Sequence, residues 1–542
     1  MDILSRIPHQ LGRVPDVARS LEVLRKAGLF DPLRPHVGIQ SLMLAKRWGP
    51  FAGSVMISAR RDSRAVGLID ERGELTFTQL EQRSNSLARA FQERGLGQGS
   101  VIAVLCRDHR GMVDTMLASA KIGAQLLLMN TGFGKQQLTA VAEREGVEAL
   151  VYDQEFTEWL QGIPDTIPRY LAWVDDAAAA AEVTKLDELI TSASDRPLPA
   201  PQHAGGFILL TSGTTGTPKG APREVKSGLS AAEFLDRIPL RTGESTFLGA
   251  PVFHATGLSQ FVLSFALGSA VVMRRRFDPE EALRCIDRHR CTALVLVPTM
   301  LQRILNLGED AIAKYDTSSL RIVFCAGSAL PPEVGNHATK IFGDVIHNLY
   351  GSTEVAVVAV ATPQDWKQAP GTVGRAPVGC KVRLYDKDGQ RITTPDTTGR
   401  VFGSSGLAFG GYTGGGSKVE IDGLLSSGDV GHFDAEGLLF IDGRDDDMIV
   451  SGGENVYPIE IENLLVEHEK VLDAAVIGVE DQDFGQRLKA FVVLRDGTAA
   501  DSDELKEYVR CNLARYKVPR EFSFLDELPR NATGKLLRSR LR

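Results

Sequence analysis

The chain has 542 residues, of which 43% are hydrophobic and 24% are charged, and its formal net charge is -8. That length exceeds one ordinary domain of roughly 100–200 residues, so two or more domains are expected. The negative charge argues against general nucleic-acid binding but leaves room for a local basic pocket that takes an anionic substrate.

The N-terminal segment, residues 1–50, mixes basic and apolar positions in a helical pattern. We expect a helical extension packed on the main body, with contact to a membrane surface as the alternative. The segment lacks the apolar centre of a signal peptide. The longest apolar stretch, residues 261–273, is shorter than the roughly 20 residues of a membrane span. The six cysteines include no Cys-x-x-Cys pair, which indicates reduced thiols in a cytoplasmic protein.

Strands and helices alternate through the next part of the chain. Residues 75–91 contain a capping box in which Thr78 is expected to start a helix, with Glu81 three residues on. Asp278 is expected to cap another helix that has Pro279 in its first turn. Continuous apolar strands between such helices predict an α/β fold with mainly parallel sheets covered on both faces.

The texture changes after about residue 375, where glycine-rich strand-and-turn sequence begins. Helices at 458–468 and 503–514, with strands at 474–479 and 489–494, predict a small α+β domain. We place its boundary near Asp445 and Asp446. The expected division is therefore the extension 1–50, a large domain 51–444 and a small mobile domain 445–542.

The stretch "TSGTTGTPKG" (211–220) follows an apolar strand and has the composition of a phosphate-binding loop. Glycines let backbone N–H groups approach phosphate oxygens, hydroxyls donate further hydrogen bonds and lysine supplies charge. It is not a Walker P-loop, because Pro218 precedes Lys219 and Gly220 follows it. A P-loop motor or kinase is therefore disfavoured.

Four later segments occur in a fixed order after this loop: "NLYGSTE" (348–354), "SSGDVG" (426–431), "DGRDDDMIVSGGENVYPIEIE" (442–462) and "LPRNATGKLLR" (528–538). Together the five resemble the core motifs of the adenylate-forming superfamily, which comprises acyl-CoA synthetases, luciferases and the amino-acid-activating domains of peptide synthetases. The resemblance covers the chain from about residue 205 to its end. It implies a large domain of parallel sheets with a β-rich subdomain, and a small C-terminal domain. It also implies that a carboxylic acid reacts with ATP to give an acyl-adenylate, and that a thiol, usually coenzyme A, then displaces AMP.

The resemblance also implies which residues bind the nucleotide. Glu354 is the expected Mg²⁺ ligand, with the Thr211 hydroxyl nearby. Asp429 is expected to bind the ribose hydroxyls with support from Arg444, and the adenine is expected to lie between residues 326–330 and the Tyr350 ring. The full set expected to bind ATP and AMP is Thr211, Ser212, Gly213, Thr214, Thr215, Gly216, Lys219, Gly327, Ser328, Ala329, Asn348, Leu349, Tyr350, Gly351, Ser352, Thr353, Asp429 and Arg444.

Lys535 in the last motif is the expected catalyst of adenylation. It would reach in from the small domain and bridge the carboxylate and the α-phosphate oxygens. Asp446 matches the family's hinge position, about which the small domain would rotate. The expected contacts to coenzyme A after that rotation are Ser451, Gly452 and Gly453.

His254 lies where amino-acid-activating relatives carry an aspartate, which argues against an amino-acid substrate. His254 is expected to close over the carboxylate end of the acid pocket. Small residues around that pocket and the uncharged run 355–360 imply an apolar acid. Residues 126–133 and the helical N-terminus most resemble bacterial long-chain fatty-acid–CoA ligases, so we expect a medium- to long-chain fatty acid. The pocket residues meant here are Ala255, Gly257, Gly327, Ser328, Ala329 and Gly351.

Other interpretations stay open at this point. They are a fatty acyl-AMP ligase that loads a carrier protein, an aryl or other apolar acid–CoA ligase, and a binding protein that has lost turnover. Arg400 departs from the family pattern, which commonly has an acidic residue there. The expected cofactors and substrates are ATP, Mg²⁺ and coenzyme A. A membrane surface and a second copy of the chain are optional partners, and nucleic acid is not one.

Overall fold

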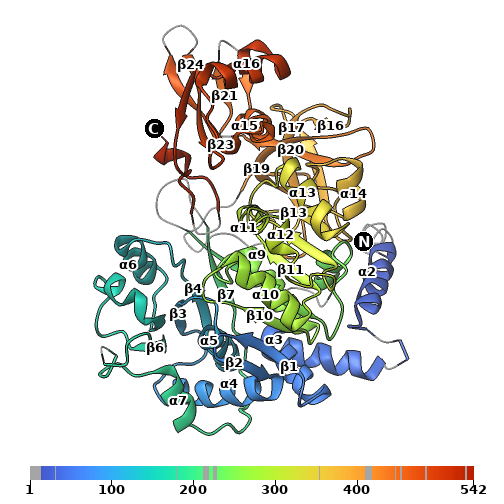
Figure 1. Cartoon of the computed structure of the whole chain (residues 1–542). Helices are drawn as coiled ribbons and strands as arrows, with labels where there is room; N and C mark the ends of the chain where they lie inside the picture. Colours follow the sequence, from blue (N-terminus) through green and yellow to red (C-terminus); the bar gives the residue numbers. More distant parts are fainter. Residues whose placement is uncertain are drawn as a thin grey trace.

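The protein is described here from a computed structural model that covers residues 14–541, except residues 31, 34, 179, 212–218, 224–228, 353, 409–417, 446, 452–453, 482–484 and 532–533. Within this part the strands form four sheets. Figure 1 shows the fourth sheet, in red, at the top of the molecule, above the strands of the third sheet.

The first sheet has eight strands in the order β14-β13-β12-β11-β9-β10-β1-β2. All neighbours are parallel except the pairs β1–β2 and β13–β14 at its edges. The central strands β11 and β12 consist entirely of buried apolar residues, as expected for a sheet covered on both faces. The strands are β1 (Val66–Asp70), β2 (Gly73–Thr76), β9 (Ser245–Leu248), β10 (Ala270–Met273), β11 (Ala293–Leu296), β12 (Ile322–Cys325), β13 (Ile346–Tyr350) and β14 (Ala359–Ala361).

The second sheet has six strands in the order β6-β5-β3-β4-β7-β8, parallel except for the β7–β8 hairpin. That hairpin brackets the predicted phosphate loop, with Thr211 paired to Lys219 across it. The strands are β3 (Val101–Leu105), β4 (Gln125–Leu128), β5 (Ala149–Asp153), β6 (Arg169–Trp173), β7 (Phe207–Thr211) and β8 (Lys219–Arg223).

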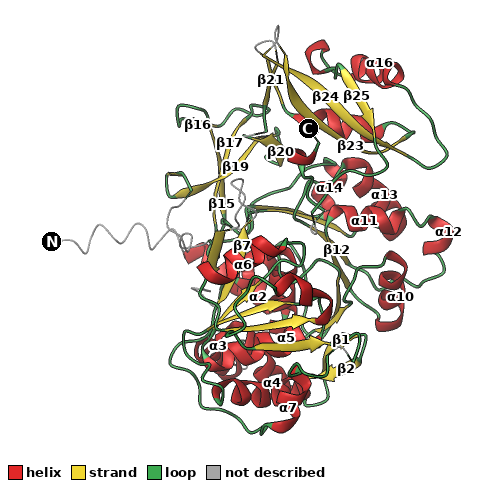
Figure 2. Cartoon of the chain, turned by 90° about the vertical axis from the view of Figure 1, so that its left-hand side faces the viewer, coloured by secondary structure: helices red, strands yellow, loops and turns green. Residues whose placement is uncertain are grey.

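Helices cover both of these sheets. Figure 2 shows α10, α11 and α13 together on one side of the first sheet. The helices of this part are α4 (Phe77–Gln92), α5 (Arg110–Ile122), α6 (Lys135–Arg144), α7 (Leu186–Ser192), α8 (Ala231–Leu235), α9 (Ala255–Ala266), α10 (Pro279–His289), α11 (Pro298–Leu305), α12 (Glu309–Ile312), α13 (Pro332–Phe342) and α14 (Pro363–Gln368), with a 3₁₀ turn η1 (Gln154–Leu160).

Two helix starts test the capping predictions. Asp278 caps α10 and accepts the Glu281 N–H at 2.8 Å, with Pro279 in the first turn, as predicted. The start of α4 was predicted two residues too late, because Thr76, not Thr78, is the N-cap. Its box partner is the Gln79 side chain. The earlier start lets Phe77 be the first helical residue and lie fully buried.

The N-terminal helices pack on the large body. In α2 (Val14–Ala27), Arg19 pairs with Asp236 at 2.9 Å. Helix α3 (Pro35–Arg61) is interrupted at Gly49, whose φ of 79° and ψ of 160° are not helical. Beyond that break, Phe51 and Val55 are buried in the main core. Among the described residues, no helix is both long and apolar enough to cross a membrane.

The third sheet is antiparallel, in the order β16-β15-β17-β19-β18 with β20 paired to β19. The fourth has the order β22-β21-β24-β23 with β25 paired to β24, and it is covered by α15 and α16. Their elements are β15 (Lys381–Tyr385), β16 (Arg391–Ile392), β17 (Gly399–Ser404), β18 (Glu420–Ile421), β19 (Leu424–Phe433), β20 (Leu439–Arg444), β21 (Ile449–Ser451), β22 (Glu454–Val456), α15 (Pro458–Glu467), β23 (Val471–Asp481), β24 (Gly485–Leu494), α16 (Ser502–Asn512), η2 (Arg515–Lys517), β25 (Glu521–Phe524) and η3 (Arg538–Arg540).

Candidate active site

The predicted site residues gather at one edge of the first sheet. Strands β9, β11, β12 and β13 are parallel, so their carboxyl ends lie side by side. The segments that follow them begin at Gly249, Val297, Ala326 and Gly351. Ligands of open α/β sheets bind at such an edge. The fold therefore brings the histidine, the adenine loop and the second motif to one place.

Tyr350, Asp429 and Arg444 form a connected polar cluster. The Tyr350 hydroxyl donates to Asp429 Oδ2 at 2.5 Å. Asp429 and Arg444 are register partners on β19 and β20, and Arg444 Nε lies 3.7 Å from Asp429 Oδ1. Burial, followed by the nearby Asp429 carboxylate, raises the pKa of Tyr350 well above its usual value. Tyr350 therefore stays a hydroxyl donor that orients the carboxylate.

The turn after β13 is tightly built. A Cβ at Gly351 would lie 1.8 Å from the Ala356 carbonyl oxygen, so no larger residue fits there. Ser352 Oγ accepts the N–H groups of Glu354 and Val355 at 3.2 and 3.1 Å. Ala356 takes a left-handed φ of 71°, a conformation that costs a non-glycine residue about 1–2 kcal/mol. The turn thus fixes the backbone of Glu354.

The start of α9 carries the predicted histidine. His254 is the N-cap residue of α9, and its ring packs on Phe253 at a centroid distance of 4.5 Å. Burial lowers the pKa of His254 to about 4. Its Nε2 atom is buried and has no hydrogen-bond partner among the described residues. His254 is therefore neutral at physiological pH, and its Nε2 is available to a ligand.

The loop that carries Lys535 is anchored to its own sheet. Arg530 donates to the Gly534 carbonyl at 2.7 Å and pairs with Asp473 of β23 at 2.8 Å. The Lys535 N–H donates to Asn531 Oδ1 at 2.9 Å, and the Lys535 side chain is exposed. A Cβ at Gly534 would lie 2.3 Å from Thr299 Oγ1 in the first turn of α11. The lysine loop is therefore docked on the edge of the first sheet.

Some predicted residues lie outside the described residues. They are Ser212, Gly213, Thr214, Thr215 and Gly216 of the phosphate loop, Thr353, the hinge residue Asp446, and Gly452 and Gly453 of the predicted coenzyme A contacts. For Thr211, Lys219 and Ser451 the structure places the backbone, on β7, β8 and β21.

The remaining predicted nucleotide residues have defined surroundings. Gly327 has a φ of 94°, and a Cβ built there would approach Thr256 Oγ1 to 3.5 Å. Asn348 is buried and donates to the Thr372 carbonyl at 3.1 Å. Ser328 and Ala329 follow Gly327 in the loop after β12, and Leu349 lies on β13.

The residues present fit ATP and magnesium. The Asp429 carboxylate can accept hydrogen bonds from ribose hydroxyls. Gly351 has no side chain, so a nucleotide can approach the backbone closely at this position. Glu354 offers a carboxylate oxygen, the ligand type that Mg²⁺ prefers.

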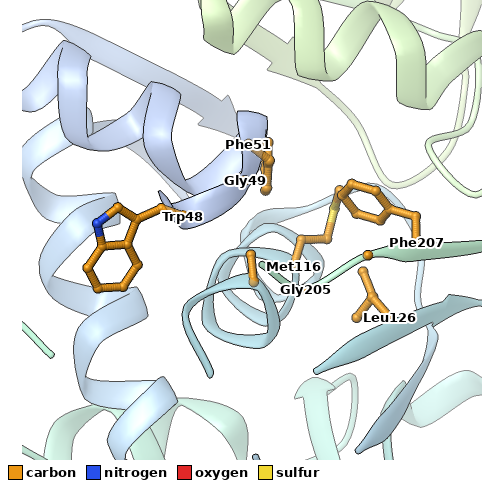
Figure 3. Close-up of a pocket in the computed structure, with 9 residues that line it drawn as sticks. Trp48, Gly49, Phe51, Met116, Leu126, Gly205 and Phe207 are labelled. Atoms are coloured by element: carbon orange, nitrogen blue, oxygen red, sulfur yellow. The ribbon is translucent and has the colours of Figure 1, made fainter. Parts of the chain in front are cut away.

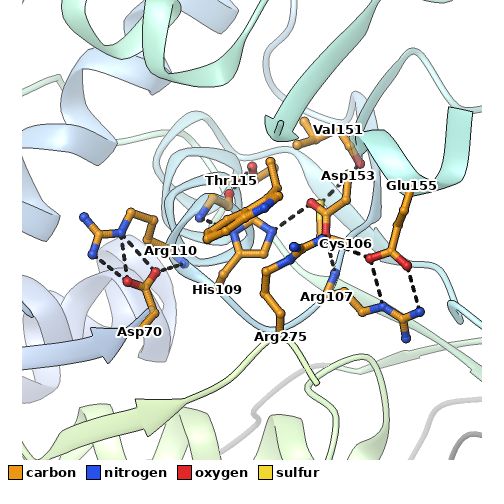
Figure 4. Close-up of polar contacts among 12 residues, drawn as sticks. Asp70, Cys106, Arg107, His109, Arg110, Thr115, Val151, Asp153, Glu155 and Arg275 are labelled. Carbon is orange, nitrogen blue, oxygen red and sulfur yellow. Dashed lines mark hydrogen bonds and ion pairs between the residues drawn. The ribbon is translucent and has the colours of Figure 1, made fainter. Parts of the chain in front are cut away.

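A second buried network lies at the carboxyl ends of β3 and β5 (Figure 4). His109 Nε2 bonds to Asp153 Oδ1 at 2.8 Å, and His109 Nδ1 accepts the Gly111 N–H at 3.0 Å. Cys106 lies close by, and burial raises its pKa well above its usual value. Both ring nitrogens of His109 have partners, Asp153 and the Gly111 N–H, so the ring is fixed in place within this buried network.

Asp108 links that network to α9. Its Oδ1 accepts the N–H of Val252, two residues before His254, at 3.1 Å. Burial raises the pKa of Asp108 to about 7. The segment before α9 is therefore held from beneath by the loop after β3.

A small apolar cavity lies away from this edge, between α3, α5, β4 and β7 (Figure 3). Trp48, Phe51, Met116 and Phe207 are among its lining residues, and its volume is about 10 Å³. A space of that size holds at most one water molecule. It is a packing defect and not the acid pocket.

The sequence did not predict three residues that hold the Lys535 loop, Thr299, Asp473 and Arg530, nor the buried Gln260 of α9. Arg530 lies within the lysine motif, and its charge beside Pro529 was a usable signal. Gln260 carries the only amide side chain in the largely apolar stretch "GLSQFVLSFA", which was also a visible signal. No local pattern pointed to Thr299 or Asp473, because their roles depend on long-range packing.

Comparisons with known proteins agree with this geometry. A model of the AMP-binding enzyme family matches residues 56–413, and one of the AMP-binding enzyme C-terminal domain matches residues 460–535. The indoleacetate–CoA ligase of Aromatoleum aromaticum is 30% identical over 479 residues, which are 86% of this chain and 93% of that protein. The fatty acid–[acyl-carrier-protein] ligase ScoC of Streptomyces coeruleorubidus is 29% identical over 496 residues, 89% of this chain and 94% of that protein.

Solved structures give the same result. The o-succinylbenzoate CoA synthetase of Bacillus subtilis, in complex with its acyl-adenylate intermediate, superimposes with a TM-score of 0.78 at 27% identity, covering 90% of this chain and 97% of that one. Another structure of that enzyme holds ATP and a magnesium ion. The family models together span most of the chain, in the order that the motifs predicted. The chain therefore belongs to the AMP-binding enzyme family, the adenylate-forming enzymes.

Proposed function

We propose that this protein is an AMP-forming acid–CoA ligase whose substrate is an aryl or other apolar carboxylic acid. The observation that carries the proposal is the docking of Gly534 against Thr299, which brings the Lys535 loop to the edge where Gly327, Gly351 and His254 lie. Relatives named for indoleacetate and o-succinylbenzoate support an acid with a ring.

The first half-reaction forms the acyl-adenylate. A carboxylate oxygen of the acid bonds to the α-phosphorus of ATP, and the bond to the β-phosphate oxygen breaks to release pyrophosphate. Both reactants are anions, so positioning and charge neutralisation supply most of the rate. Lys535 stabilises the charge between the carboxylate and the α-phosphate, while Asp429, supported by Arg444 and oriented by the Tyr350 hydroxyl, holds the ribose. Glu354, with Thr211 nearby, would hold Mg²⁺, which would supply neutralisation of the phosphate charge.

The second half-reaction transfers the acyl group to coenzyme A. The thiol sulfur bonds to the acyl carbon, the bond between that carbon and the phosphate oxygen of AMP breaks, and the thiol proton leaves to solvent. Lys535 is not needed for this step. The small domain, 445–542, rotates about Asp446 and presents Ser451, Gly452 and Gly453 to coenzyme A.

A medium- to long-chain fatty acid is the second candidate substrate. The likeness to ScoC supports it, and also supports a carrier protein as the alternative acceptor. The His254 ring and the small residues around Gly327 suit either acid, because neither candidate carries an ammonium group for an aspartate to bind.

The test is release of pyrophosphate and AMP from ATP with a panel of acids, each with and without coenzyme A. The panel holds benzoate, phenylpropanoate, indoleacetate, octanoate and palmitate. Turnover with ring acids that depends on coenzyme A is the expected result. Turnover with fatty acids alone would overturn the aryl assignment. Pyrophosphate release without any thioester would replace coenzyme A by a carrier protein as the acceptor.

A further inference from the structure

Helix α9 presents two different faces to the interior. One face carries Phe261 and Phe265, which stack on Phe51 of α3 at centroid distances of 5.2 and 5.4 Å. Residues four apart lie on the same face of a helix. Thr256, Gln260 and Ser264 follow this spacing and form a polar row along another face.

The two ends of this polar row have identified neighbours. Thr256 Oγ1 lies 3.5 Å from where a Cβ of Gly327 would be, so this end faces the loop after β12. Ser264 Oγ donates to Thr246 Oγ1 of β9 at 3.3 Å, so the other end faces the sheet. Gln260 lies between them, one turn of α9 after Thr256 and one turn before Ser264.

Gln260 has no partner in this position. Its side chain is 1% exposed, and neither Nε2 nor Oε1 has a hydrogen-bond partner among the described residues. Buried polar side chains nearly always have partners, so an unpartnered pair of amide atoms calls for an explanation. The Nε2 atom of His254, the N-cap residue of the same helix, also has no hydrogen-bond partner among the described residues.

We infer that Gln260 is a specificity-determining residue that binds a hydroxyl group at the far end of the acid. The inference rests on the proposed function. A hydroxyl both donates and accepts, so it satisfies Oε1 and Nε2 together. Gln260 lies roughly 9 Å further along the helix axis than His254, at 1.5 Å per residue. The hydroxyl therefore belongs at the end of the acid remote from its carboxyl group.

The residues around Gln260 are uncharged, which supports a neutral group on the acid as the partner of Gln260. Burial keeps His254 uncharged, and the amide carries no charge. The polar row contains only hydroxyl and amide groups, and its neighbours Thr246 and Gly327 are uncharged. A second carboxylate on the acid would meet no cation here and would lose its hydration.

The experiment compares acids that differ in one group. The pair is 3-(4-hydroxyphenyl)propanoate and 3-(4-methylphenyl)propanoate, in which a hydroxyl replaces a methyl of similar size. The kcat/KM for pyrophosphate release is measured for the wild type, for Gln260→Met and for Gln92→Met, an exposed glutamine of α4 as the matched control. We expect the wild type to prefer the hydroxy acid by about tenfold or more. Gln260→Met loses that preference and Gln92→Met retains it.

The melting temperature of the free enzyme is the second readout. Replacement of an unpartnered buried amide by the apolar Met side chain leaves the melting temperature equal or higher. An unchanged preference between the two acids in Gln260→Met overturns the inference, as does a large fall in its melting temperature with the preference kept. If the wild type releases pyrophosphate with no acid of the panel or the pair, the proposed function falls and the inference with it. If both acids react without preference in both proteins, only the inference falls.

Discussion

The proposed nucleotide side and the proposed acid side of the site are built differently. On the nucleotide side the polar groups bond to one another: Tyr350 to Asp429, and Asn348 to the Thr372 carbonyl. On the acid side His254 Nε2 and the Gln260 amide have no partner among the described residues. An invariant ligand allows a network that is complete before binding, whereas the acid side keeps its polar groups for the ligand that sets specificity.

Lys535→Ala has the largest expected effect. It tests whether catalysis is independent of the difference between the nucleotide side and the acid side. Loss of one transition-state donor lowers the rate of adenylation by on the order of 10²–10³. The loss should be equal for every acid, because the proposed role of Lys535 involves only the reacting groups that all of the acids share. Pyrophosphate release measures it, with Lys506→Ala, a partly exposed lysine of α16, as the control. Thioester formation from pre-made acyl-adenylate should be much less affected, and an equal fall in both half-reactions would contradict the assignment.

Tyr350→Phe tests the nucleotide side. The hydroxyl that orients Asp429 is lost, and hydrogen bonds to charged groups contribute about 1.5–3 kcal/mol, so kcat/KM for ATP falls by about 10–100-fold. The same factor is expected for each acid. Tyr385→Phe is a matched control, because Tyr385 also donates to a carboxylate, Asp422, at 2.7 Å, in the third sheet. A loss that varied from acid to acid would break the separation of the two sides.

Gly534→Ala tests the docking of the lysine loop, which acts on both sides at once. The added Cβ meets Thr299 Oγ1 at 2.3 Å, at a φ of 74°. Adenylation is expected to fall about tenfold, since small misplacements of a catalytic group are costly. Gly497→Ala controls for backbone strain, because Gly497 has a φ of 75° with nothing within 4 Å. Equal effects of the two substitutions on adenylation would show that strain, and not docking, is responsible.

The smallest expected effect concerns the pH dependence of stability, which two histidines, His254 and His347, are expected to influence. Burial lowers the pKa of both His254 and His347 to about 4. The unfolded chain binds these protons below about pH 6.5 and the folded chain does not, so stability is lost as pH falls from 6.5 toward 4. Each histidine costs at most about 1.4 kcal/mol per pH unit.

Melting temperatures between pH 4.5 and 7 check this prediction. His254→Asn and His347→Asn should each flatten the acid decline, whereas His203→Asn, an exposed control, should not. Asp108 works in the opposite direction, because its pKa of about 7 lets the folded state hold a proton that the unfolded state releases. The difference between variants is therefore the measure. A variant as steep as the wild type would mean that the histidine is already protonated or exposed in the folded state.

Much of this architecture could be predicted from the sequence. Buried runs such as residues 293–296 and 322–325 became parallel strands, because apolar residues at every position require cover on both faces. The motif residues Tyr350, Asp429 and Arg444 came together as predicted, although they lie far apart in the chain.

Other features depended on long-range packing. The α4 start moved from Thr78 to Thr76 because Phe77 had to be buried. The contact of Gly534 with Thr299 joins segments that no local pattern connects. The role of Gln260 required knowing which atoms lack partners. The division at residues 50 and 444 stays a prediction, as do the roles of the individual site residues.

The docking of the lysine loop has a consequence for the balance between the two proposed half-reactions, adenylation and transfer to coenzyme A. The loop can approach Thr299 because Gly534 has no side chain. The small domain also contacts α13 through an ion pair of 3.3 Å between Arg495 and Glu333, whose side chains are each more than one third exposed. Exposed pairs of this kind contribute about 0–1 kcal/mol. In the proposed rotation, contacts this weak would let both domain orientations be populated, and bound ligands would decide the balance by mass action. The proposed function then implies that the ratio of coenzyme A to ATP sets the share of time spent in each orientation.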